Sequence, residues 1–226
     1  MIRGLVLLGA VIATAVPAIA LGDDVPPPLE PPASRASEPP PAPPAAAPGP
    51  EAPVVRRPDE LLIAIDPGHG GADPGAIGVL PPGTRTGLTR RRGGRALLEK
   101  DVNLDVSRRL QRWLETRGYR TIMTRTRDRG AGDLPYRREG EDLARRSRIA
   151  NEAGADLFIS VHANASLTGA FRGTETYHFY VASTGGRDLA RSVQERMIAR
   201  IGLPNRGVRR AGFHVLRATT MPAVLV

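Results

Sequence analysis

Short apolar runs alternate with helical periodicity along the chain beyond residue 58. The run Leu61–Ile65 ends at an Asp-Pro-Gly turn, and Asp156–Val161 is a second run of the same kind. Strands that are covered on both faces of a parallel sheet are continuously apolar, so both runs are predicted to be buried strands. Tyr119–Thr124 and Met221–Val226 are predicted to be two further strands.

Three segments carry apolar residues at helical spacing. The first predicted helix ends at Gly118, the second covers Glu141–Ala153 and stops at Gly154, and the third precedes the last strand. The apolar stripes are Val102, Val106, Leu110, Trp113 and Leu114 in the first helix and Leu189, Ala190, Val193, Met197, Ile198 and Ile201 in the third. This alternation predicts an α/β fold in which a mostly parallel, twisted sheet has helices on both faces. We expect a single domain over residues 59–226.

The first 58 residues have a different pattern. An uncharged apolar run, Gly4–Val16, follows Arg3 and precedes the small-x-small site Ala18-Ile19-Ala20, which is typical of an export signal. The run is shorter than the ~20 residues that a membrane span needs, so we expect cleavage near Ala20 and no stable span afterwards. Residues 1–20 are therefore predicted to be a signal peptide and the protein to be exported, to the periplasm or cell envelope.

Residues 21–58 are predicted to be a disordered linker. Fourteen of the 22 prolines lie there, with few large apolar side chains between them, so the segment cannot build a core. The remaining residues 59–226 hold 28 basic and 18 acidic side chains, a net charge of +10. For an exported protein this charge favours anionic polymers of the envelope over nucleic acid. The stretch Val79–Leu98 is expected to overhang the mouth of the cleft, and the Arg-rich stretch Thr84–Arg95 within it is expected to assist binding to the cell wall.

Candidate metal ligands lie where the predicted strands end. His69 follows the first strand among glycines, and His162 follows Asp156–Val161, so both imidazoles are expected at one edge of the sheet. Glu99 stands where the chain enters the first helix. Two imidazoles and one carboxylate are the ligand set of a zinc site with an open fourth position, and the chain has no cysteine to offer instead. Taken alone, each residue, Glu99 above all, also fits a solvated loop position or a helix cap.

Four motifs carry a resemblance to a known family. In chain order they are Ile65–Gly78, Glu99–Leu104, Ala155–Ala165 and Met221–Val226. They resemble the successive motifs of the zinc-dependent N-acetylmuramoyl-L-alanine amidases of cell-wall remodelling. The resemblance implies that His69, Glu99 and His162 bind one zinc ion. It also implies the reaction, which is hydrolysis of the amide between N-acetylmuramic acid and L-alanine in peptidoglycan, and leaves open an unidentified protein activator.

The last motif departs from the family. In similar amidases it continues with a glutamate that acts as the general base, whereas this sequence stops at Val226. We therefore expect the base directly after Val226, the C-terminal end of the domain to be missing, and the 226-residue chain to be impaired. Glu175 is the substitute within the chain, and strand alternation places it beside Tyr177. His178 and His214 are expected to be strand residues and not ligands.

Two other functions remain compatible with these residues. A non-catalytic, zinc-containing protein that binds peptidoglycan or activates another enzyme would keep the ligands without the general base. A zinc exopeptidase of similar α/β architecture would need a recognition site for a free peptide terminus. Residues beyond Val226 would separate the amidase from the non-catalytic protein, and a second metal with further carboxylate ligands would favour the exopeptidase.

Overall fold

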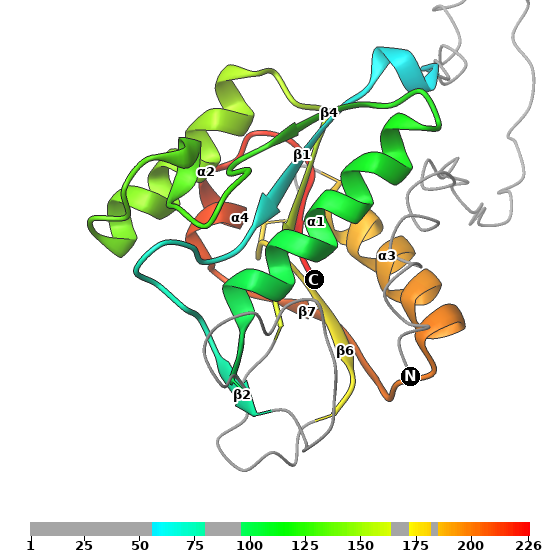
Figure 1. Ribbon diagram of the computed structural model, residues 1–226. Coiled ribbons are helices and arrows are strands. Elements are labelled where there is room, and N and C mark those ends of the chain that lie inside the picture. The colour runs from blue at the N-terminus through cyan, green and yellow to red at the C-terminus, as the bar shows by residue number, and fades with distance from the viewer. Residues whose placement is uncertain (1–55, 80–95, 164–171, 182–184) are drawn as a thin grey trace, which may run out of the picture. The chain divides into compact units, whose positions relative to one another are not determined.

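The computed structural model describes residues 56–79, 96–163, 172–181 and 185–226 (Figure 1). The predicted signal peptide, nearly all of the predicted linker and the Arg-rich stretch Thr84–Arg95 lie outside these residues. Their assignments therefore stay predictions. No helix in the described ranges has the length and apolar content that crossing a bilayer requires.

Six strands form one sheet in the order β4-β1-β5-β8-β6-β7. Neighbouring strands are parallel except for β6 and β8, which are antiparallel. Ile65 of β1 pairs with Met123 of β4 on one side and with Ile159 of β5 on the other. The strands are β1 (Leu62–Pro67), β4 (Arg120–Met123), β5 (Leu157–Val161), β6 (Thr174–His178), β7 (Asn205–Arg210) and β8 (Ala223–Leu225).

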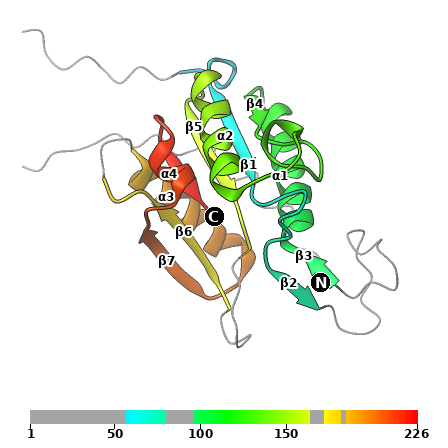
Figure 2. The same ribbon diagram turned by 90° about the vertical axis from the view of Figure 1, so that its left-hand side faces the viewer.

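Helices cover both faces of this sheet, with α1 and α3 on one side and α2 and α4 on the other (Figures 1 and 2). A small antiparallel pair, β2 with β3, precedes α1. The mostly parallel α/β fold predicted from the sequence is thereby confirmed. The remaining elements are β2 (Ile77–Val79), β3 (Ala96–Leu98), α1 (Glu99–Glu115), α2 (Glu139–Glu152), α3 (Gly186–Ile201), α4 (His214–Ala218) and the 3-10 turns η2 (Pro58–Glu60) and η3 (Ala131–Asp133).

Alternate residues of the central strands fill two separate cores. Ile63 and Ile65 of β1 pack in the cluster that contains most of the apolar stripes of α1 and α3. Ala64 of β1 and Phe158 of β5 pack in the other cluster, with residues of α2 and α4. Both faces of β1 and β5 are therefore buried, which is why their sequences are continuously apolar and not alternating.

Four elements were not predicted from the sequence pattern. β7 is a polar edge strand, β2 and β3 have three residues each, and α4 is a five-residue helix. Each is too short or too polar to show a clear period. His214 was expected in a strand, and this expectation is wrong because His214 begins α4. His178 does end strand β6, where it is buried.

Phe158 is the largest apolar side chain that is fully buried, and its truncation tests this core arrangement. Phe158→Ala is expected to lower the free energy of unfolding by about 3–5 kcal/mol, since it removes a large transfer energy and leaves a cavity. Leu203→Ala is the control, because Leu203 is 46% exposed. Equilibrium urea unfolding measures both changes, and a loss below about 1 kcal/mol for Phe158→Ala would contradict the packing described here.

Candidate metal centre

The loop that follows β1 brings His69 to the sheet edge in a left-handed conformation. The φ angle of His69 is 61°, a region that a non-glycine residue occupies only under constraint. Two nearby glycines make room for the ligands. A Cβ on Gly68 would lie 2.3 Å from His162 Nε2, and one on Gly75 would lie 2.6 Å from the His69 ring. The glycines of this motif are therefore required by the close approach of the side chains around them.

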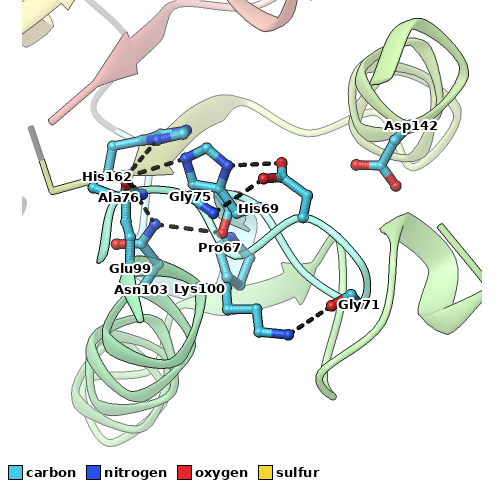
Figure 3. A network of polar contacts seen from close by, with 12 residues as sticks. Pro67, His69, Gly71, Gly75, Ala76, Glu99, Lys100, Asn103, Asp142 and His162 are labelled. Atoms are coloured by element: carbon cyan, nitrogen blue, oxygen red, sulfur yellow. Dashed lines mark hydrogen bonds and ion pairs between the residues drawn. The ribbon is translucent and has the colours of Figure 1, made fainter. Parts of the chain in front are cut away.

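His69, Glu99 and His162 meet at this edge (Figure 3). One potential donor atom from each residue lies within 4.8 Å of the others. Glu99 Oε1 is 3.3 Å from His69 Nε2 and 3.0 Å from His162 Nδ1, and the two imidazole rings stand edge to face with centroids 4.8 Å apart. The three residues named from the sequence as ligands are thus brought together from three separate elements.

Glu99 is the buried member of the group and is fixed by backbone donors. It is the first residue of α1, its side chain is 6% exposed, and it accepts hydrogen bonds from Ala76 N at 2.8 Å and Ala163 N at 2.9 Å. Burial alone would raise the pKa of Glu99, but hydrogen bonds with His162, His69 and these amides hold it well below its usual value. The carboxylate is therefore ionised and held in place, as a metal ligand must be.

Asp73 orients the His69 ring through Nδ1, the ring nitrogen that does not face Glu99. Its Nδ1 lies 2.8 Å from Asp73 Oδ2, and Asp73 Oδ1 accepts a hydrogen bond from Gly75 N at 3.0 Å. Burial tends to lower the pKa of His69, but hydrogen bonds with Glu99 and Asp73 outweigh it, and the pKa is raised. A carboxylate on Nδ1 leaves Nε2 to face the Glu99 side, which is the usual arrangement of a metal-binding histidine.

A buried guanidinium supports the loop from beneath. Arg146 of α2 is 1% exposed and donates to Pro67 O, His69 O and the carboxylates of Asp66 and Asp142, each at 2.7 Å. Burial opposes the charge of Arg146, but Asp66 and Asp142 raise its pKa above the ordinary value. Arg146 therefore stays charged and satisfies carbonyls that no strand or helix would otherwise bind.

Arg125 and Lys100 complete this support. Arg125 donates to Pro67 O, Gly68 O and Lys100 O at 2.9 Å each. Burial and the neighbouring Arg146 lower the pKa of Arg125 to about 10, so it remains a cation at neutral pH. Lys100 Nζ donates to Gly71 O at 2.6 Å, as Figure 3 shows. Three cationic side chains thus hold the carbonyl of Pro67, the last residue of β1, and those of the loop residues Gly68, His69 and Gly71.

A pocket of about 300 Å³ opens beside the three ligands. Its near end is formed by His69, Glu99 and His162, and the part called the far end is lined by residues of α2 and α4 and by residues that precede these helices. The residues of the far end are Tyr136, Glu139, Leu143, Phe213, His214 and Val215. Burial and the carboxylates of Asp73, Glu139 and Asp142 raise the pKa of Tyr136, so its phenol keeps the proton at neutral pH.

Glu175 lines a second cavity of about 330 Å³, which shares His162, Ala163 and Leu225 with the first. As strand alternation predicts, it lies beside Tyr177, whose hydroxyl donates to Glu175 Oε1 at 2.6 Å. Arg209 Nε is 2.7 Å from its other oxygen. Within the described residues Glu175 is not part of the potential metal-binding group.

Sequence reasoning missed the residues that support the ligands. Asp73 lies inside the quoted first motif, and its spacing of four from His69 is a signal that could have found it. Arg146 stands in a helix beside Arg145 and Arg148, and nothing local marks it as the buried one. Arg125 lies between two threonines directly after β4 and is equally unmarked.

The donor set fits zinc. Two imidazole nitrogens and one carboxylate oxygen satisfy its preference for nitrogen and oxygen donors, and three protein ligands leave a position open. The sequence profile of the N-acetylmuramoyl-L-alanine amidases matches residues 63–226, which is most of the chain and includes all three candidate ligands. The chain belongs to this amidase family.

Individual members of the amidase family agree with this assignment. The N-acetylmuramoyl-L-alanine amidase LytC of Bacillus subtilis is 37% identical over 166 residues, which are 73% of this chain and 28% of LytC. The germination-specific N-acetylmuramoyl-L-alanine amidase of the same species is 32% identical over 73% of this chain and 65% of its own length. The crystal structure of the N-acetylmuramoyl-L-alanine amidase from Clostridium difficile 630 has a TM-score of 0.57 and 32% identity, and covers 73% of this chain and 77% of that one. The chain thus spans less than two thirds of these two curated relatives.

Arg146 can be tested as the support of the ligand loop. In Arg146→Lys the charge is kept, but one ammonium cannot reproduce the planar fork that reaches two carbonyls and two carboxylates. We expect zinc affinity to fall by about 10–100-fold, which is the usual cost of losing a group that orients metal ligands. Competition with a chromophoric chelator measures it. Arg148→Lys on the exposed face of α2 is the matched control, and equal affinities in the two variants would refute this role.

Proposed function

We propose that this protein hydrolyses the amide between N-acetylmuramic acid and L-alanine in peptidoglycan, outside the cytoplasm. The observation that carries the proposal is the convergence of His69, Glu99 and His162 beside an open pocket in a chain of the amidase family. The predicted export signal and the basic charge of residues 59–226 support a place in the cell envelope.

In this proposal His69, Glu99 and His162 hold one zinc ion. Zinc with three protein ligands lowers the pKa of water in its open position to about 7 and polarises a carbonyl oxygen, which are the two needs of amide hydrolysis. The chain's own residues provide position and charge. Glu99 stays ionised through its backbone donors, and Asp73 holds the His69 ring so that Nε2 faces the Glu99 carboxylate.

The general base is proposed to follow Val226 directly. Val226 N donates to Ser160 O, and His162 N donates to Val226 O, both at 2.9 Å. The chain therefore runs alongside β5 up to the ligand His162. A carboxylate placed on the next residue would emerge beside the ligands, where it can accept a proton from the attacking water and return it to the leaving amine.

Zinc content tests the ligand assignment. The wild-type protein is expected to keep one zinc ion per chain after dialysis, whereas Glu99→Ala and His162→Ala should keep almost none, because two ligands bind zinc too weakly. His214→Ala is the matched control, since His214 lines the same pocket outside the ligand group. Elemental analysis by mass spectrometry gives the ratio. Full zinc content in either ligand variant would remove that residue from the site.

Product analysis on purified peptidoglycan tests the reaction. A chain with glutamate directly after Val226 is expected to expose new amino-terminal alanine, and the chain ending at Val226 to do so about 10²–10⁴-fold more slowly, because a general base contributes that much. A chelator should stop the reaction and added zinc should restore it. Amino-terminal labelling after digestion measures the alanine.

The same experiment separates the other functions. Release of single amino acids would indicate an exopeptidase, and binding to the wall without any new amino terminus would indicate a non-catalytic protein. Equal rates for the two chains would place the base within residues 59–226, with Glu175 as the leading candidate.

A further inference from the structure

The far end of the pocket beside the ligands carries polar groups that the protein itself does not use. Within the described ranges, no hydrogen bond or ion pair engages the side chains of Tyr136, Glu139 or His214, although all three line this cavity. Polar side chains that converge on a cavity without partners are typical of ligand recognition. A phenol and an imidazole ring carry hydrogen-bonding groups that a ligand can use, and a carboxylate accepts hydrogen bonds.

The same end of the pocket has an apolar wall. Phe213 is 42% exposed, an unusual exposure for a phenylalanine, and its ring is held edge to face by Tyr177 with centroids 5.2 Å apart. Leu143 and Val215 line the cavity beside it. An aromatic ring that is packed against one neighbour and partly exposed in a cavity offers an apolar contact at little entropic cost.

The charge at this end of the pocket disfavours the peptide stem of the proposed substrate. The cation that lines the cavity is Arg146, and it is already bound to Asp66 and Asp142. Glu139 adds a carboxylate that has no cationic partner among the described residues. A peptide stem carries at least its terminal carboxylate and would be repelled here, whereas a sugar ring is neutral and presents hydroxyl donors to these acceptors.

We propose that the pocket between α2 and α4 is the saccharide subsite, which binds a neutral N-acetylated sugar ring on the acyl side of the scissile amide. Phe213 contacts the apolar face of the ring, while Tyr136, Glu139 and His214 bind its hydroxyl and acetamido groups. This inference rests on the proposed function and deepens it. In this proposal the peptide stem leaves the ligands in another direction, away from α2.

The test compares two soluble ligands that carry the same dipeptide and differ only in the sugar. N-acetylmuramoyl-L-alanyl-D-isoglutamine carries the sugar, and the lactoyl analogue of the same dipeptide carries only its three-carbon acid. Calorimetry with the zinc-loaded chain is expected to show about tenfold tighter binding of the sugar-bearing ligand, in line with one aromatic contact and several hydrogen bonds. Phe213→Ala should remove most of this preference and leave the affinity for the lactoyl ligand unchanged.

Two further variants keep the test independent of folding. Tyr136→Phe removes one hydroxyl from the cavity and should reduce the preference several-fold, whereas Leu203→Ala, an exposed residue after α3, should keep it. Equal affinity of the wild type for both ligands would overturn the inference. So would a Phe213→Ala variant that weakens both ligands alike while Tyr136→Phe changes nothing.

Turnover of the two ligands distinguishes this inference from the proposed function. If the chain with glutamate after Val226 binds the sugar-bearing ligand preferentially but cleaves neither amide, the proposed reaction fails and the saccharide subsite stands. If it cleaves both amides with equal efficiency and equal affinity, the reaction stands and the subsite fails.

Discussion

The left-handed turn at His69 is the constraint on which the rest of the site depends. Strand β1 delivers the chain to the sheet edge, and at His69 the backbone must reverse so that the imidazole faces Glu99 and His162. A turn of this kind leaves its carbonyls without strand partners. Arg146 and Arg125 supply those partners from the core side, so a strained conformation is held by charged hydrogen bonds.

Two cationic side chains, Arg146 and Arg125, are therefore buried in the interior. Neighbouring carboxylates offset the desolvation cost of this positive charge. Asp66 accepts from Arg146, Thr124 and Ser160, and Asp142 accepts from Arg146 and from Ala131 N. Burial would raise the pKa of Asp66, but Arg146 and the two hydroxyls hold it below its usual value. Removing one partner of such a network leaves an uncompensated buried charge, which typically costs about 3–5 kcal/mol. The ligand loop and the fold are therefore energetically linked through α2.

The sequence could predict the features that depend on local patterns, but not those that depend on how distant elements pack together. β1 and β5 are buried on both faces, so their apolar runs were visible without tertiary information. The convergence of the three candidate ligands could be predicted because strand ends and glycine-rich turns are local features. Arg146 was not, because its burial depends on where α2 packs against β1, and its neighbours Arg145 and Arg148 are chemically identical. The far end of the pocket could not be predicted either, since Phe213 and Tyr136 come to line one pocket only through the packing of α4 against α2.

The central claim is that His69, Glu99 and His162 bind one zinc ion above a loop held by Arg146. Anomalous diffraction at the zinc absorption edge from crystals of the zinc-loaded protein tests it most directly. The account predicts one strong peak within about 2.0–2.2 Å of a donor atom from each of the three residues. It also predicts that the Arg146 guanidinium stays on the carbonyls of Pro67 and His69. A peak bound by other side chains, or no peak at the three residues in crystals that contain zinc, would contradict the account.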